Sequence, residues 1–264
     1  MSSPIWTPAA LQSEVQPIDS TAWRLVEAQH VVSTLSLVDS LEEQAMLEDI
    51  LETTKPPLPK DCQGLDYLLA TPFRYRPYPH GSRFRRAGLT KGVWYGSEAP
   101  ETALAEMVFY RFLFYAESPK TPFPGNPADY TAFSAALSSE RALDLTTGGL
   151  KADAADWQHH TDYTSCQNIA DTAREIDVGI LRFASVRDPS KGANFAVLDC
   201  RAFRNSAPLD RQTWRIRISR TGAQAVRDYP RLGLEFSPTA FNDDPRVAEM
   251  VWERYAISNI TGAN

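Results

Sequence analysis

The chain has 264 residues, of which 43% are apolar, which is enough for one large or two small globular domains. Thirty-three acidic residues against twenty-seven lysines and arginines give a formal net charge of −6, which argues against direct binding to nucleic acid. No run of about eighteen apolar residues is free of charges, and the start MSSPIWTPAALQSEV lacks the basic head and apolar centre of a secretory signal. We therefore expect a cytoplasmic protein without a membrane span.

The cysteines and histidines indicate neither a disulfide framework nor a metal site. Cys62, Cys166 and Cys200 are odd in number and widely spaced, so we expect all three to be reduced and structural. The neighbouring His159 and His160 would point about 100° apart on a helix, and no cysteine or carboxylate is spaced to complete a ligand set with them. We predict no bound metal.

The first part of the chain favours helix. Residues from about 20 to 54 are mostly good helix formers, with apolar side chains such as Trp23, Val26, Met46 and Ile50 spaced three to four apart. The proline-rich segment 55–60 then forms a stiff connector, because proline lacks the amide hydrogen and restricts the residue before it. We divide the chain into an N-terminal helical extension with its connector, 1–60, and a body, 61–264. The extension is expected to bind a partner or a second copy, or alternatively to cap the core of the body.

The body mixes short strand patterns with isolated helices. Strands are predicted where aromatic and β-branched residues gather, at 73–78, 92–96, 130–133, 179–186, 194–198, 213–219 and 232–236. Helices are predicted at 101–116, 163–176 and 245–255. Helices and strands do not alternate regularly, which disfavours a doubly wound parallel sheet and favours a mixed α+β fold.

Positive charge gathers in one short stretch of this acidic chain: Arg74, Arg76, Arg83, Arg85, Arg86 and Lys91. A small ligand with several phosphates is one explanation of this cluster, and a solvated basic loop is the other. No Gly-x-Gly-x-x-Gly motif follows a strand and no P-loop motif is present, so a nucleotide would bind in some other way.

Six short motifs follow one another in a fixed order. They are Thr71-Pro-Phe-Arg-Tyr-Arg-Pro, Gly81-Ser-Arg-Phe, Gly92-Val-Trp-Tyr-Gly-Ser, Glu101-Thr-Ala-Leu-Ala-Glu106, Gly179-Ile-Leu-Arg-Phe-Ala-Ser185 and Gly192-Ala-Asn194-Phe-Ala-Val-Leu. No single motif is specific, but the ordered set, from about residue 68 to 198, resembles the RES domain, which is named for its arginine, glutamate and serine.

The resemblance assigns the arginines and tyrosines as follows. Arg74 and Tyr75 resemble the family's early Arg-Tyr pair, and Tyr95 resembles the tyrosine that ends the next strand. Arg83 resembles the arginine of the family's Gly-Gly-Arg-Trp motif. Serine replaces the second glycine of that motif, and the loop that follows is longer than usual, so Arg85 is the alternative for the functional arginine.

The acidic and polar positions follow in the same way. Glu106 lies eleven residues after Tyr95, as the family's glutamate does. Ser185 resembles the family serine, and Asn194 resembles the asparagine that follows it.

These residue types suit the cleavage of NAD⁺. Breaking the nicotinamide–ribose bond makes an oxocarbenium-like ribose, which Glu106 can stabilise or whose hydroxyl it can hold. The planar forks of Arg74 and Arg83 match the oxygens of a diphosphate, and Tyr75 or Tyr95 can stack on the nicotinamide ring. The predicted catalytic residues are Glu106, Arg83, Tyr95 and Ser185, and the predicted NAD⁺-binding residues are Arg74, Tyr75, Arg83, Tyr95, Ser185 and Asn194.

The resemblance also implies a fold and a biological setting. It implies an ADP-ribosyltransferase-like fold with a curved mixed sheet and flanking helices. It implies a toxin of the RES–Xre type of toxin–antitoxin module, silenced by an Xre-like antitoxin that covers the active site. Family members pass ADP-ribose to water, phosphate or a protein. We therefore expect an NAD⁺ glycohydrolase or phosphorylase, with a mono-ADP-ribosyltransferase acting on a protein and a non-catalytic NAD⁺-binding module as the alternatives.

Overall fold

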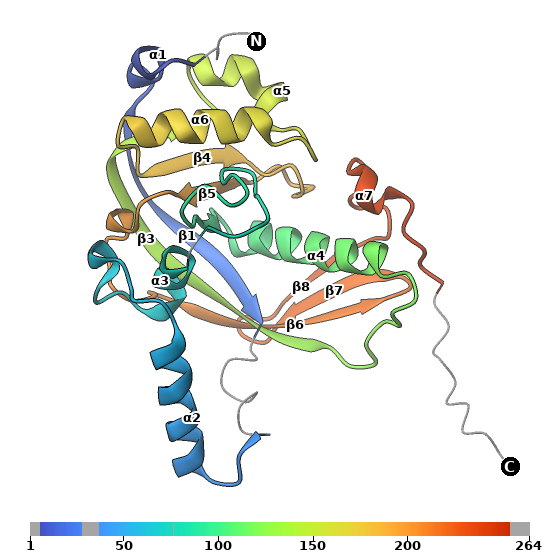
Figure 1. Ribbon diagram of the computed structural model, residues 1–264. Coiled ribbons are helices and arrows are strands. Elements are labelled where there is room, and N and C mark those ends of the chain that lie inside the picture. The colour runs from blue at the N-terminus through green and yellow to red at the C-terminus, as the bar shows by residue number, and fades with distance from the viewer. Residues whose placement is uncertain (1–5, 28–36, 76, 254–264) are drawn as a thin grey trace, which may run out of the picture.

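A computed structural model describes residues 6–27, 37–75 and 77–253, which form the predicted mixed α+β fold around a sheet of eight strands (Figure 1). The strands are β1 (Gln16–Glu27), β2 (Trp94–Ser97), β3 (Ala128–Asp144), β4 (Ile180–Ala184), β5 (Ala193–Val197), β6 (Arg211–Ser219), β7 (Gly222–Arg227) and β8 (Leu232–Phe236). The α-helices are α1 (Pro8–Gln12), α2 (Leu41–Thr54), α3 (Tyr67–Arg74), α4 (Pro100–Glu117), α5 (Ala154–Trp157), α6 (Thr164–Glu175) and α7 (Pro245–Ala248). None of the described helices is both long enough and apolar enough to cross a membrane.

The sheet is curved because part of it closes on itself. Its strand order is β1-β2-β5-β4-β3-β6-β7-β8, and β1 also pairs with β3, so five strands form a ring. The long strand β3 belongs to both parts of the sheet, since its first residues pair with β6 and its last residues pair in parallel with β4. The strands β6, β7 and β8 continue the sheet beyond the ring, and the helix α4 contacts β1 and β2 of the ring and also β8 (Figure 1).

β1 occupies residues for which the sequence predicts helix. It pairs antiparallel with β3, from Gln16 opposite Ala142 to Glu27 opposite Tyr130, and Trp23 lies opposite Ser97 of β2. The apolar spacing in this segment fits a helix as well as a strand. Pairing with β2 and β3, which are distant in sequence, makes it a strand. The predicted helix is therefore wrong for β1 and confirmed for α2, while residues 28–36 lie outside the described part of the chain.

Most other predicted elements are confirmed, including the helices α4 and α6. The predicted strand at 73–78 is wrong, because residues up to Arg74 form α3, whose start is capped by Asp66 Oδ1 accepting the Leu68 amide (2.8 Å). The strand β7 was not predicted. The C-terminal helix begins at Pro245 as expected but ends at Ala248, and the prediction beyond residue 253 falls outside the described residues.

The sequence of α4 explains both its start and its buried face. Pro100 occupies the first turn, where its missing amide is not needed, and Glu101 faces the positive end of the helix. Leu104 and Phe112 are buried in a core cluster that also holds Trp214 of β6. This packing fixes the rotation of α4 and hence the direction of the side chains between its buried positions.

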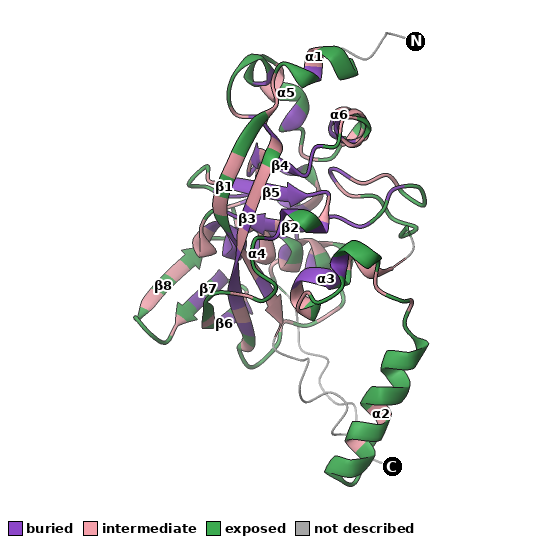
Figure 2. Cartoon of the chain, turned by 90° about the vertical axis from the view of Figure 1, so that its left-hand side faces the viewer, coloured by how far each residue is buried: buried purple, intermediate pink, exposed green. Residues whose placement is uncertain are grey.

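The helix α2 stands apart from the rest of the fold (Figures 1 and 2). None of its residues is buried, and its start is capped by Ser40, whose hydroxyl accepts the Glu43 amide (3.1 Å). Its far end is tied to α3, where Arg74 donates to the Glu52 carboxylate (2.6 Å) and to the Pro56 carbonyl (2.5 Å). The division of the chain at residue 60 stays a prediction, but β1 places residues before it in the same sheet as residues after it.

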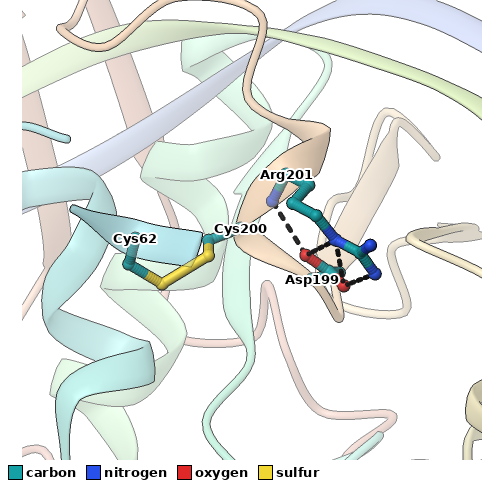
Figure 3. The surroundings of a disulfide bond; sticks show 4 residues. All are labelled: Cys62, Asp199, Cys200 and Arg201. Carbon is teal, nitrogen blue, oxygen red and sulfur yellow. Dashed lines mark hydrogen bonds and ion pairs between the residues drawn. A yellow bond between two sulfur atoms is a disulfide. The ribbon is translucent and has the colours of Figure 1, made fainter. Parts of the chain in front are cut away.

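Cys62 and Cys200 form a disulfide (Figure 3). It joins two short 3-10 turns, Lys60–Cys62 and Cys200–Ala202, that lie 138 residues apart in sequence. The expectation that all three cysteines are reduced is wrong for this pair, because spacing along the chain does not report the 5.8 Å that separates their Cα atoms in the fold. Cys166 has a free, buried thiol, and burial raises its pKa.

Candidate active site

A hollow of about 210 Å³ lies where α4 meets the ring of strands. Its lining includes four of the predicted site residues: Arg83, Tyr95, Glu106 and Asn194. A larger hollow of about 650 Å³ beside β7 and β8 holds none of them. The smaller hollow is the candidate site, because several polar side chains converge there on one carboxylate.

Glu106 is held from three directions. Its Oε1 accepts hydrogen bonds from Ser185 Oγ and Asn194 Nδ2, both at 2.7 Å, and its Oε2 accepts one from Arg187 Nη1 at 2.8 Å. A carboxylate has about four acceptor positions. Among the described residues three of these are filled, and the fourth is on Oε2.

Strand register brings Asn194 to Glu106. Ser97 of β2 lies opposite Asn194 of β5, and its hydroxyl donates to Asn194 Oδ1 at 2.6 Å. The amide nitrogen of Asn194 therefore faces Glu106. Ser97 was not among the predicted residues, although it ends one of the motifs.

Ser185 lies where the chain leaves β4. Its hydroxyl accepts the amides of Arg187 (3.3 Å) and Asp188 (3.1 Å) while donating to Glu106. Asp188 accepts a hydrogen bond from Thr102 at the start of α4 (2.7 Å), which ties the turn to the helix. Ser185 thus supports Glu106 from beside the hollow.

Arg187 is a central residue of the site that the sequence analysis missed. Its side chain is 7% exposed, and besides Glu106 it donates to the hydroxyls of Tyr110 (3.0 Å) and Tyr163 (2.9 Å). The guanidinium also stacks over the rings of Phe109 and Tyr110. Burial opposes its charge, but the Glu106 carboxylate and the tyrosines outweigh burial, so the pKa of Arg187 is raised. Its position three residues after the end of β4 is the only local mark, and that mark does not by itself indicate a site.

Arg83 lines the hollow, and one of its two terminal guanidinium nitrogens binds main-chain carbonyls. Its Nη1 donates to the carbonyls of Trp157 (2.7 Å) and His159 (3.0 Å), and its guanidinium lies over the ring of Tyr163. Its Nη2 is buried and has no hydrogen-bond partner among the described residues. Arg83 therefore anchors the loop before α6 and keeps one donor group unused.

Arg24 of β1 is a second cation that the sequence analysis missed. It lines the hollow, and its guanidinium lies over the indole of Trp94, 5.6 Å from the ring centroid. Within the described ranges no hydrogen bond or ion pair joins Arg24 to another side chain. Burial lowers its pKa to about 10, which leaves it protonated at neutral pH. Because β1 was predicted as part of the helical extension, Arg24 was not considered.

Tyr95 forms part of the wall of the hollow. Its hydroxyl makes a hydrogen bond with Ser82 Oγ (2.9 Å) and accepts the Phe84 amide (3.0 Å). Burial raises its pKa, so the hydroxyl stays protonated. Through these bonds Tyr95 fixes the loop that carries Arg83.

The structure does not bring the pair Arg74 and Tyr75 to this hollow. Arg74 ends α3 and bonds to Glu52 of α2, while Tyr75 contacts the ring of Tyr78. The reason is that α3 is a helix where the sequence predicted a strand, and it turns toward α2. Arg85, the alternative to Arg83, also lies outside the lining, with its guanidinium over Tyr78. Arg76 lies outside the described residues.

The histidine pair takes part in local contacts. His159 Nδ1 accepts the amides of Thr161 (3.3 Å) and Asp162 (2.8 Å), and His160 Nδ1 lies 3.9 Å from the Asp244 carboxylate. Burial lowers the pKa of His160. In the described part of the chain, no three histidine, cysteine, aspartate or glutamate side chains gather in a way that could hold a metal ion.

Comparison with known proteins identifies the family. The model of the RES domain matches residues 58–219, more than half of the chain, so the chain belongs to the RES domain family. No curated protein sequence matches it. Among solved structures, it is similar to a chain in the crystal structure of the M. tuberculosis MbcT–MbcA toxin–antitoxin complex, with 12% identity, a TM-score of 0.45, and coverage of 90% of this chain and 95% of that chain. The matched span holds Glu106, Ser185 and Asn194 but begins after β1 and Arg24.

Proposed function

We propose that this chain is the toxin of a bacterial toxin–antitoxin pair, and that it acts in the cytoplasm by cleaving the nicotinamide–ribose bond of NAD⁺. Membership of the RES domain family supports this function. The observation that carries it is Glu106, fixed by Ser185, Asn194 and Arg187. Among the described residues one acceptor position of Glu106 stays open, and Arg24 beside it makes no ion pair.

The size of the hollow indicates how NAD⁺ binds. Pockets that enclose a whole drug-sized ligand measure about 300–1,000 Å³. At about 210 Å³ this one suits the nicotinamide and its ribose, with the rest of the molecule outside. Arg24 and Arg83, which both line the hollow, are the cations nearest to hand for the diphosphate.

The chemistry needs little proton transfer. When the bond between ribose C1′ and the nicotinamide nitrogen breaks, both electrons leave with nicotinamide, which departs as a neutral molecule. The positive charge that develops on the ribose is stabilised by Glu106, and the open position on Oε2 accepts a ribose hydroxyl. Water then adds to C1′ and loses a proton, giving ADP-ribose, nicotinamide and one proton. Phosphate or a protein side chain replaces water if it is the acceptor.

An Xre-like antitoxin is the proposed partner, and it would silence the enzyme by covering the hollow. The residues around the hollow come from β1, β2, α4, β4, β5 and the loops that carry Arg83, Tyr163 and Arg187, so a partner that covers the hollow would contact several of these segments. The alternative, a non-catalytic NAD⁺-binding module, does not account for a carboxylate held in one position by three donors.

Incubation of the purified protein with NAD⁺ labelled in the adenylate part tests the function. We expect release of nicotinamide, and the fate of the label identifies the acceptor: free ADP-ribose, a phosphorylated ADP-ribose in phosphate buffer, or a labelled protein band in lysate. Glu106→Gln should reduce release at least about a hundredfold. Absence of nicotinamide release by the wild type contradicts the function.

Glu98 supplies the matched control. It also pairs with an arginine, Arg182, at 2.6 Å, but it lies outside the hollow. Glu98→Gln should keep normal turnover. If Glu106→Gln also keeps normal turnover with a similar melting temperature, Glu106 has no part in the reaction.

A further inference from the structure

Only one oxygen of the Glu106 carboxylate, Oε2, has an acceptor position left for a ligand among the described contacts. Ser185 and Asn194 fill both acceptor positions of Oε1, so a ligand must approach Oε2. Among the described residues, the one donor to Oε2 is Arg187 Nη1, at 2.8 Å. The direction of the remaining lone pair therefore depends on where Arg187 holds this oxygen.

Arg187 is itself fixed on several sides. Glu106 and Tyr110 are one helical turn apart on α4, and the same Nη1 donates to both. From the other direction, Tyr163 accepts Nη2, and the ring of Phe109 lies beneath the guanidinium, 4.3 Å from its carbon. A planar fork makes these contacts together, and a lysine ammonium, which is a single point of charge, does not.

Arg187 also separates two hollows. The candidate site, about 210 Å³, and a neighbouring hollow of about 380 Å³ share Val186 and Arg187 in their linings. The second hollow lies against Ser185 and His160. Because Arg187 lines both hollows, we expect that shortening its side chain opens a path between them.

We propose that Arg187 is a positioning residue, which aims Oε2 of Glu106 at the ribose and closes the site behind it. This role rests on the proposed cleavage of NAD⁺. Arg187 acts through Glu106 and does not bind the diphosphate, which distinguishes it from Arg24.

Steady-state kinetics of Arg187→Ala with NAD⁺ tests the proposal. We expect kcat to fall about thirtyfold to a hundredfold while KM changes less than about threefold, since an interaction that matters only in the transition state is lost. Guanidinium chloride at concentrations that do not unfold the protein should restore kcat at least about fivefold, because the ion fills the vacated space and bonds to Oε2. The same concentration of sodium chloride should restore nothing.

Two further variants serve as controls. Arg187→Lys keeps the charge and most of the volume, and it replaces the alanine variant if that protein does not fold. We expect its kcat to fall about tenfold. Arg182→Ala removes an arginine of β4 that bonds Glu98 and Asp144 outside the hollow, and it should leave kcat unchanged and insensitive to guanidinium. The proposal is overturned if kcat is normal in both Arg187 variants, if KM alone rises, or if guanidinium rescues nothing in a folded alanine variant.

A measurement without NAD⁺ separates this proposal from the proposed function. In protein labelled with ¹³C at glutamate carboxyl groups, the Glu106 signal is the one that Glu106→Gln removes. We expect this signal to move in both Arg187 variants and to stay in place in Arg182→Ala. If the wild type does not cleave NAD⁺ but the Glu106 signal moves in the Arg187 variants, only the NAD⁺ function is contradicted. An active wild type whose signal is the same in the Arg187 variants contradicts the positioning role alone.

Discussion

Ser97 and Asn194 lie opposite each other on β2 and β5, and the hydrogen bond of 2.6 Å between them decides which end of the Asn194 amide faces Glu106. The oxygen and the nitrogen of the amide are nearly the same in shape, so packing alone would not fix the orientation of the amide. Strand register is therefore part of the site, since a shift by one residue would turn Asn194 to the other face of the sheet.

Substitutions at this pair should have graded effects. Ser97→Ala lets the amide rotate and should lower kcat about threefold to tenfold, whereas Asn194→Asp sets a second carboxylate against Glu106 and should lower it at least about a hundredfold. Nicotinamide release measures both. Ser139→Ala, which removes a hydroxyl that donates to the Arg141 carbonyl outside the hollow, is the control. Equal losses in Ser97→Ala and Asn194→Asp would contradict the orienting role.

Substitutions of Arg24 and Arg74 should differ in their effect on NAD⁺ binding. Arg24→Ala should weaken binding about tenfold to a hundredfold, since a charge-assisted contact is worth about 1.5–3 kcal/mol. Arg74→Ala should leave it unchanged, because Arg74 bonds Glu52 outside the hollow. Calorimetry in the Glu106→Gln background measures binding without turnover. If Arg74→Ala weakens binding and Arg24→Ala does not, the pair Arg74 and Tyr75 holds the diphosphate after all.

Tyr95 gives a prediction about pH. Burial raises its pKa in the folded protein, whereas an unfolded tyrosine ionises near pH 10. Below about pH 10 both states are protonated and the stabilisation is fully present; above it the unfolded state loses its proton first, so stability falls as pH rises. A pH series from about 9 to 11 brackets the ordinary tyrosine pKa of about 10. Over this series the melting temperature should fall more steeply with rising pH in the wild type than in Tyr95→Phe. Equal slopes would show that another group is responsible.

The helix α2 and the strand β1 should behave differently on removal. Replacing residues 41–54 by a glycine–serine segment of equal length should leave the melting temperature and NAD⁺ cleavage nearly unchanged, because α2 has no buried residue. A chain that starts at Lys60 loses β1, with buried Ala22 and Leu25, and should be insoluble or inactive. A folded, active chain from Lys60 would contradict the role of β1 in the sheet.

The sequence predicted the parts of the site that local motifs mark. Glu106 lies on α4, Asn194 lies on β5 and Ser185 directly follows β4, and the sequence pattern of each of these elements is clear. The same reasoning missed Arg24, because β1 has no local signature that separates it from a helix, and its partners lie more than a hundred residues away in β3. It missed Arg187 because a single arginine after a strand indicates no site until Tyr110 of α4 and Tyr163, just before α6, are known to bind it. The Arg74–Tyr75 pair was placed by analogy of motif, and helix α3 directs it elsewhere.

The closed ring of strands has a consequence for synthesis of the protein. β1 precedes the other described strands along the chain, yet it pairs with β2 and β3, and β2 in turn pairs with β5, which ends at Val197. Contacts between such distant segments form late and slowly. A nascent chain therefore carries Arg24 and Glu106 for much of its translation without a pocket to hold them together. We expect the proposed NAD⁺ cleavage to begin only after β5 has left the ribosome and closed the ring of strands.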